Sequence, residues 1–382
     1  MSSLDKVRKL HPEPDKAHIA KEPGEKFKGF DFLRAIFVVV VVALKSNLFL
    51  ITEAVISSAL ADILMAKVGY LAVPIFLQIS LFLLYIKLNK VGSLYFFKKR
   101  LPKLIYLYMF WVGLKVLFDV ANGNIGALKA NFSSARSSIE FIVSGGNSPF
   151  FFFFSLILLS TLATALFILL RRVPRSSLRR FINYFLLSIS CILVFSLSVV
   201  EIFVEQLSGH PATVLLSAIS NFTFWDYNPI AFLPYIFTTA IITQEVNEEK
   251  LREWSASLKL KIYFLLALYI LFFILEWHLF ENMLHYSRLS LVFGSWLLLY
   301  FGILCKHQPS NLFKFLSACS LGIYGFHVFF TQTFSANKVN LFEVVLKSVP
   351  VSEIIASFVI TLIGSIGLTL LFRRIRWLKN FV

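Results

Sequence analysis

The chain has 382 residues, of which 58% are apolar and only 15% are charged, and its mean hydropathy is +0.77. On a soluble globule this mixture would expose far too much apolar surface, so the composition excludes a soluble protein and predicts lipid as the solvent. The net charge of +16 is typical of nucleic-acid-binding proteins, but here Lys and Arg gather at alternate ends of the apolar segments. Cytoplasmic loops of membrane proteins carry such an excess, so the charge is a topology signal and no nucleic-acid partner is expected.

Ten apolar stretches are long enough to cross a bilayer, for which a helix needs roughly 20 apolar residues. They lie near residues 30–51, 68–88, 101–121, 150–171, 180–204, 228–245, 258–277, 287–305, 313–332 and 350–372. The polar breaks between them are short, so no room remains for a separate soluble domain. The predicted fold is an all-α polytopic membrane bundle of about ten transmembrane helices, with residues 1–28 as a polar tail and residues 29–382 as the membrane domain.

Basic residues in the connections predict the orientation of these spans. The tail, the second and fourth connections and the C-terminal end are rich in Lys and Arg, whereas residues 206–227 contain neither. Both termini are therefore expected on the cytoplasmic side, and residues 206–227 on the outside. The end of this external connection is aromatic, which predicts either a lid or an ordinary aromatic belt at the membrane interface.

Two cations, Arg34 and Lys45, interrupt the first span. They are separated by about three helical turns, so both side chains point from the same face, about 16 Å apart along the axis. A cation at the bilayer centre costs roughly 2.5–3.5 kcal/mol and normally faces an interior or a water-filled cavity. The pair therefore predicts one side of a tunnel, the alternative being that each side chain reaches the nearest headgroups.

A second basic group surrounds the predicted cytoplasmic start of the third span and consists of Lys98, Lys99, Arg100 and Lys103. Pro102 fits the first turn of a helix, where its missing N–H costs nothing. Such a cluster at a helix start can hold the phosphates of a nucleotide-bearing cofactor. Retention of positive charge on the cytoplasmic side explains the same residues, so both interpretations stay open.

His327 lies deep in the ninth span, toward its predicted external end. A lone histidine on an apolar helix is either a hydrogen-bonded packing residue or a catalytic base. The other histidines lack ligand-like spacing, and no H-E-x-x-H, G-x-S-x-G or P-loop pattern occurs. The sequence therefore offers no support for a metal site or a serine hydrolase.

Four segments, taken in order, resemble acyltransferase family 3, whose members move acyl groups from coenzyme A to glycans and other acceptors. FDFLRAIFVVVVVALK resembles the opening arginine-to-histidine motif of the family, and VPIFLQISLFLL resembles its second-helix pattern, which usually reads VPLFFVLSGFLL. FFKKRLPKLIYLYMFW resembles the basic start of the third helix, and SLGIYGFHVFF resembles the late Ser-x-x-x-Tyr-x-x-His segment. The resemblance extends from about Phe30 to Phe372.

Three positions depart from the family pattern. Lys45 stands where the opening motif carries histidine, Leu81 replaces the usual glycine after Ser80, and the basic pair is Arg100 with Lys103 instead of two arginines. The first departure bears on chemistry, because a lysine, with an ordinary pKa of about 10.4, is protonated near neutral pH unless desolvation lowers its pKa by several units, and an ordinary lysine is inert as a base. An acyl-lysine would be an unactivated amide, so a covalent carrier role is not expected either.

The resemblance implies transfer of an acyl group, expected to be acetyl, from cytoplasmic acyl-coenzyme A to a hydroxyl of a glycan or lipid-linked acceptor at the outer face of a bacterial inner membrane. It implies no metal. Arg34 would guide the donor inward, and Lys45 and His327 would stand near the thioester, with His327 the better base. The donor's phosphates would be held by the basic residues of the third span: Arg100, Lys103, Lys98 and Lys99.

Two alternatives from other functional classes stay open. Loss of the opening histidine favours an inactive relative that serves as a scaffold or binding subunit of an envelope complex. A transporter for a lipid or glycan is the other, although the chain shows no inverted pair of broken segments of the kind that many transporters contain.

Overall fold

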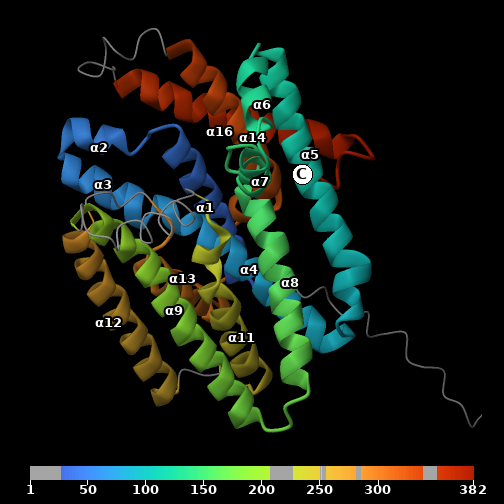
Figure 1. Ribbon diagram of the computed structural model, residues 1–382, viewed down its shortest axis with the longest axis vertical. Helices are drawn as coiled ribbons and strands as arrows, with labels where there is room; N and C mark the ends of the chain where they lie inside the picture. The colour runs from blue at the N-terminus through green and yellow to red at the C-terminus, as the bar shows by residue number, and fades with distance from the viewer. Residues whose placement is uncertain (1–26, 207–226, 250, 252–254, 281–284, 339–350) are drawn as a thin grey trace, which may run out of the picture.

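The computed structural model describes residues 27–206, 227–249, 251, 255–280, 285–338 and 351–382. Within these ranges every regular element is a helix, and eight helical segments are long and apolar enough to cross a membrane (Figure 1). The predicted all-α fold class is thereby confirmed. The predicted polar tail and the predicted external lid fall almost entirely on residues 1–26 and 207–226, outside the described residues.

Each of the ten predicted spans corresponds to helical structure. The matching helices are α1 (Gly29–Lys45), α3 (Ser58–Lys67) continued by η2 (Gly69–Leu71) and α4 (Ala72–Val91), α5 (Leu101–Ala121), α8 (Phe151–Arg171), α9 (Ser176–Gln206), η4 (Pro229–Phe232) with α11 (Pro234–Asn247), α12 (Ala256–Leu279), α13 (Leu289–Leu304), α14 (Asn311–Lys338) and α16 (Val351–Arg374). The short elements between them are α2 (Leu50–Val55), the π-helical turn η3 (Phe96–Arg100), α6 (Ile125–Asn131) and α7 (Ala135–Val143). Only α1 and α13, with 17 and 16 residues, are shorter than the eight long segments.

The first span is shorter than its apolar run, which was predicted to reach residue 51. The helix ends at Lys45, and the Ser46 hydroxyl donates to the carbonyl of Val42 at 2.7 Å. Asn47 then adopts a φ of +60°, a left-handed conformation that asparagine tolerates better than most residues and that stops the helix. Lys45 therefore lies at a helix end with an exposed side chain, and not in the middle of a membrane-spanning helix.

The directions of neighbouring helices agree with the alternation of spans expected from the loop charges. α1 and α14 correspond to the first and ninth spans and pack in parallel. Near their starts the Ser317 hydroxyl donates to Asp31 at 2.6 Å, and farther along both helices Val38 and Val42 share one buried apolar cluster with Cys319 and Ile323. α14 and α16 are antiparallel, as consecutive spans must be, and the late residue Arg373 donates to the carbonyl of Ala318 near the start of α14.

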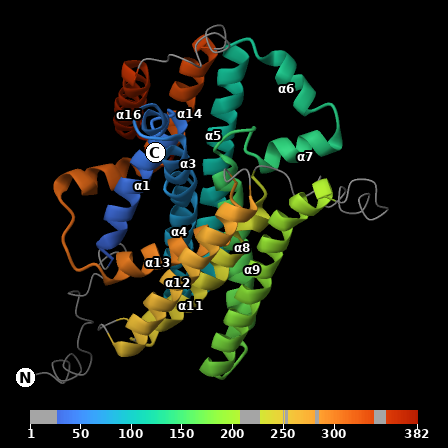
Figure 2. The same cartoon turned by 90° about the vertical axis from the view of Figure 1, so that its left-hand side faces the viewer.

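The interior of the bundle is built around α4, whose apolar stretch is mostly buried, whereas those of α12 and α16 are mostly exposed. α4 packs against α8, α11 and α13. Figure 1 shows α12 at the edge of the bundle, and Figure 2 shows the α6–α7 pair projecting from the end of α5. The large apolar side chains that α12 exposes, such as Phe264 and Leu271, are those that lipid would cover.

A buried charge network joins α3, α12 and α13. The Lys67 ammonium donates to the Glu276 carboxylate at 3.1 Å and to the Ser290 hydroxyl at 3.0 Å, and the Ser290 amide donates to the other carboxylate oxygen at 2.8 Å. The Lys67 and Glu276 side chains are 4% and 0% exposed. Because these charges are removed from solvent, Lys67 depends on Glu276 for compensation, and Glu276 also lies close enough for its charge to act on the buried Arg288.

Replacing Glu276 alone is therefore expected to be worse than replacing the pair. Glu276→Leu should lower the free energy of unfolding by about 3–5 kcal/mol, because it leaves the Lys67 ammonium buried without a counter-charge. The double variant Lys67→Met/Glu276→Leu should recover only part of this loss, because the buried Arg288 still lacks the charge of Glu276. Thermal unfolding of the purified protein in detergent measures both, and a double variant as unstable as the single one would contradict the expectation.

Candidate functional site

One cavity brings together several of the residues expected at a donor site. It has a volume of about 450 Å³ and lies between α1, α4, α5, α8 and α14. We call it the basic pocket. Its lining consists of Asp31, Arg34, Phe76, Ser80, Arg100, Lys103, Leu104, Leu107, Phe152, Phe153, Leu156, Lys314, Ser317, Ala318, Ser320, Leu321, Tyr324 and Val382.

The charged end of the basic pocket carries four cations, Arg34, Arg100, Lys103 and Lys314, and one carboxylate, Asp31. The carboxylate accepts the hydrogen bond of the Ser317 hydroxyl that ties α1 to α14. Cations therefore outnumber the carboxylate, and the excess favours an anionic ligand at this end.

The π-helical turn η3 separates the basic residues of the third span into two groups. Phe96, at its start, is fully buried, whereas Lys98 and Lys99 are exposed and lie outside the lining of the pocket. Arg100 ends the turn and lines the pocket, and its Nε is buried without a hydrogen-bond partner among the described residues. π-helical turns are frequent at functional sites, and this one brings Arg100, but not its two lysine neighbours, to the cavity.

The other end of the basic pocket is aromatic. The ring centroid of Tyr324 lies 6.4 Å from that of Phe76, 5.2 Å from that of Phe152 and 5.9 Å from that of Phe153. The Tyr324 hydroxyl is held in place because it donates to the carbonyl of Pro149. The pocket thus changes from cationic to apolar along its length, a polarity that matches an elongated ligand with an anionic head.

The segment that follows α16 covers one side of the same cavity. Val382 is part of the pocket lining, and the ring of Phe381 stacks on Phe110 of α5 at 4.3 Å between centroids. Leu378 is buried as well. Side-chain packing therefore brings the end of this segment against α5 beside the cavity.

His327 lies one turn beyond Tyr324 on α14, with 5.6 Å between the two ring centroids. Its side chain is fully buried, is not part of the lining of the basic pocket, and has no hydrogen-bond partner for either ring nitrogen among the described residues. Lys45 is close enough for its charge to act on this imidazole. Of the two residues predicted along the tunnel, Arg34 lines the cavity and Lys45 does not; His327, the predicted base, lies outside the lining as well.

Sequence reasoning missed the contributions of Asp31, Lys314, Ser317 and Tyr324 to the cavity. Ser317, Ser320 or Leu321, and Tyr324 follow a spacing of three to four residues on α14, so they share one face of that helix, and His327 continues the row. That spacing was a usable signal. Asp31 offered less, because a carboxylate in the first turn of a helix is ordinarily explained by the helix dipole.

Two glycines let α14 approach its neighbours closely. A Cβ on Gly322 would lie 2.4 Å from the Thr369 hydroxyl oxygen of α16, and a Cβ on Gly325 would lie 2.1 Å from the Trp111 ring of α5. Both distances are far inside van der Waals contact. The absence of a side chain at these positions therefore sets the distance of α14 from α16 and α5, and with it the width of the cavity.

Gly325→Ala should destabilise the protein by about 1–3 kcal/mol, because the added methyl forces the buried Trp111 ring to move in a packed interior. Gly113→Ala on α5 is the matched control, since its Cβ would meet no atom within 4 Å and alanine favours a helix over glycine. Thermal unfolding in detergent compares the two variants. Equal unfolding temperatures for them would show that the Gly325 contact does not limit packing.

The acyltransferase 3 family, whose sequence model is described as an acyltransferase domain, matches residues 27–370, which is nearly the whole chain and includes the lining of the basic pocket up to Tyr324. No curated protein and no solved structure matches the chain.

Proposed function

Because this chain belongs to the acyltransferase 3 family and is an integral multi-pass membrane protein, we propose that it transfers an acetyl group from acetyl-coenzyme A to a hydroxyl of a glycan or lipid-linked acceptor. In this proposal the donor arrives from the cytoplasm, and the acceptor lies at the outer face of a bacterial inner membrane, where envelope proteins are potential partners. Membrane acyl transfer is the activity of the family, whereas donor, acyl group, acceptor and location are the proposed parts.

The basic pocket is the observation that carries the donor assignment. Coenzyme A joins a phosphate-rich nucleotide to a long, uncharged arm that ends in the thioester. Arg34, Arg100 and Lys103 at one end of the cavity suit the phosphates, and the aromatic end at Tyr324 suits the arm. Lys314 adds a fourth cation to the same end.

The proposed chemistry places the thioester carbonyl beside His327. The neutral imidazole takes the proton of the acceptor hydroxyl as the oxygen attacks the thioester carbonyl, so that a new C–O bond forms. The C–S bond then breaks, and the coenzyme A thiolate leaves and receives the proton from the imidazolium. Lys45 takes no step in this chemistry, because an ammonium cannot accept the proton of the acceptor hydroxyl.

The donor assignment predicts a difference between two adjacent pairs of basic residues. Arg100→Gln/Lys103→Gln should weaken acetyl-coenzyme A binding about tenfold or more, because two charge-assisted phosphate contacts are lost. Lys98→Gln/Lys99→Gln removes the same charge from exposed side chains outside the pocket lining and should change affinity little. Calorimetric titration of the protein in detergent, at two salt concentrations, measures both.

Equal affinities for the two double variants, both folded, would contradict the donor assignment and leave the basic cluster as a topology signal alone. The salt dependence gives a second criterion. Affinity of the unaltered protein should fall with ionic strength, and the Arg100→Gln/Lys103→Gln variant should show a weaker dependence because it has fewer phosphate contacts.

A second candidate function follows from one observation, the end of the basic pocket at Tyr324. Since Lys45 and His327 lie beyond that end, a protein in which the cavity stays closed would bind the donor without transferring its acyl group. Such a protein would act as a binding subunit of an envelope complex. Lysine in place of the family's histidine at position 45 is compatible with this alternative.

His327→Gln separates the two functions. If the chain is a transferase, this change should lower the transfer rate about 100-fold or more while donor affinity stays the same, because only the base is lost. Lys45→His should support transfer at least as fast as the unaltered protein, since imidazole is substantially neutral near pH 7. Release of free coenzyme A in the presence of glycan acceptors measures the rate, and donor binding with no turnover in any variant would favour the binding protein.

A further inference from the structure

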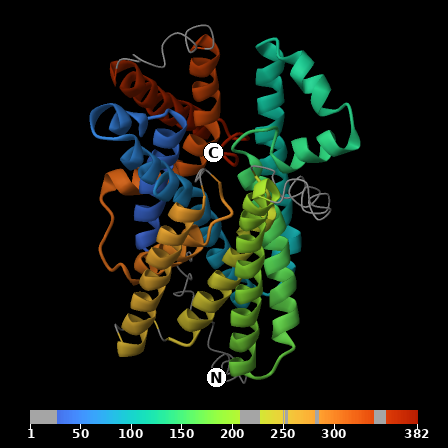
Figure 3. The ribbon, with the colours of Figure 1, turned by 60° about the vertical axis from the view of Figure 1, so that its left-hand side comes forward.

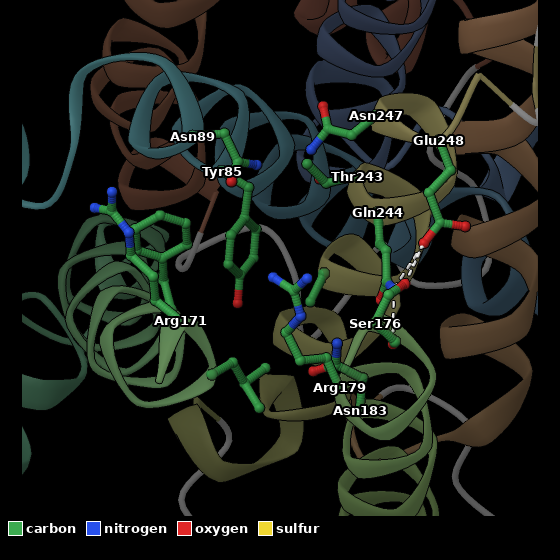
Figure 4. Close-up of a pocket in the computed structure, with 13 residues that line it drawn as sticks. Tyr85, Asn89, Arg171, Ser176, Arg179, Asn183, Thr243, Gln244, Asn247 and Glu248 are labelled. Carbon is green, nitrogen blue, oxygen red and sulfur yellow. Dashed lines mark hydrogen bonds between the residues drawn. The ribbon is translucent and has the colours of Figure 1, made fainter. Parts of the chain in front are cut away.

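A second cavity of about 450 Å³, which shares no residue with the basic pocket, lies between the ends of α4, α8 and α11 and the start of α9 (Figure 4). We call it the arginine pocket. Its polar lining includes Tyr85, Arg171, Arg179 and Asn183. Figure 3 shows the α8–α9 turn and the adjoining ends of α11 and α12 at the same end of the bundle, which is the predicted cytoplasmic end.

The single carboxylate of the arginine pocket, Glu248, accepts hydrogen bonds on both of its oxygens. Arg180 donates to one of its oxygens, and the Ser176 hydroxyl and the Gln244 amide each donate to the other at 2.9 Å. The dashed lines in Figure 4 mark the contacts from Ser176 and Gln244. Arg180 balances the charge of Glu248, so the guanidinium of Arg179 is left without a counter-ion among the described residues of the pocket.

Three polar groups of the arginine pocket are buried without partners. The Tyr85 hydroxyl, the Asn183 side-chain oxygen and Arg179 Nε have no hydrogen bond among the described residues, and Tyr85 and Asn183 are each only 4% exposed. In Figure 4 the Tyr85 hydroxyl and the Arg179 guanidinium point into the same space. Buried polar groups normally have hydrogen-bond partners, so three such groups facing one cavity indicate a site for a polar ligand.

The chemistry of the cluster selects a phosphate group. An arginine fork matches phosphate oxygens, and the amide of Asn183 and the hydroxyl of Tyr85 add neutral partners. Ser176, Arg179 and Asn183 share one face of the first two turns of α9, where the positive end of the helix dipole also favours an anion.

The apolar part of the lining indicates how the phosphate arrives. Phe167 and Leu170 of α8 form one wall of the arginine pocket, next to the cation Arg171 at the end of the same helix. A free phosphate ion makes no favourable contact with an apolar wall, whereas the first carbons of a lipid can pack against it. We propose that the arginine pocket binds the headgroup phosphate of a phospholipid in the adjoining leaflet.

The test uses the full chain in detergent and three probes: dioctanoyl phosphatidylglycerol, dioctanoylglycerol without a phosphate, and inorganic phosphate. Thermal stabilisation as a function of probe concentration yields the affinities. The phospholipid should bind saturably and dioctanoylglycerol should not. Arg179→Gln should weaken phospholipid binding about tenfold, because a charge-assisted contact is lost.

Arg175→Gln is the matched control, since it removes an exposed arginine just before α9 that lies outside the pocket lining. Equal weakening by Arg179→Gln and Arg175→Gln, or no weakening by Arg179→Gln, would overturn the site. Saturable, Arg179-dependent binding of inorganic phosphate with the same affinity as the phospholipid would overturn the lipid as its source. If Arg179→Gln does not fold, Tyr85→Phe, which removes only the hydroxyl, must weaken phospholipid binding for the proposal to stand.

Discussion

The parallel contact between α1 and α14 is the constraint on which the candidate site depends. One helix contributes Arg34 and Lys45, and the other contributes Ser317, Tyr324 and His327. Because the two helices run in the same direction, residues at similar depth face each other, from the Asp31–Ser317 hydrogen bond to the apolar cluster of Val38, Val42, Cys319 and Ile323. Segments almost 300 residues apart thereby form one side of the basic pocket.

The sequence was sufficient for the helical architecture because the bilayer leaves few alternatives. Backbone groups in lipid must be satisfied within their own segment, so long apolar runs become helices, and the ten runs indeed correspond to helices. The end of the first helix could not be predicted in the same way. The apolar run continues past Lys45, but the helix stops there because Asn47 adopts a left-handed backbone conformation. Hydropathy carries no information about such a conformation.

The candidate site was only partly predictable for a related reason. Arg34, Arg100 and Lys103 stand out in the sequence as cations in or beside apolar runs, and they do line one cavity. Lys98 and Lys99 look identical to them in sequence, and the π-helical turn alone separates the two groups. The pairing of Lys67 with Glu276 was equally invisible, since 209 residues separate the partners and neither belongs to a recognisable motif.

The way α14 is held has a mechanical consequence for the cavity. This helix is fixed on three sides, by a hydrogen bond to α1 and by glycine contacts too close to compress against α16 and α5. A rigid wall cannot yield when a bulky molecule enters. The segment after α16 has no such restraint, because Phe381 and Val382 reach the cavity only through side-chain packing. The wall that Val382 forms is therefore easier to displace than the polar face of α14, so a bulky ligand meets one fixed side of the cavity and one side held by side-chain packing alone.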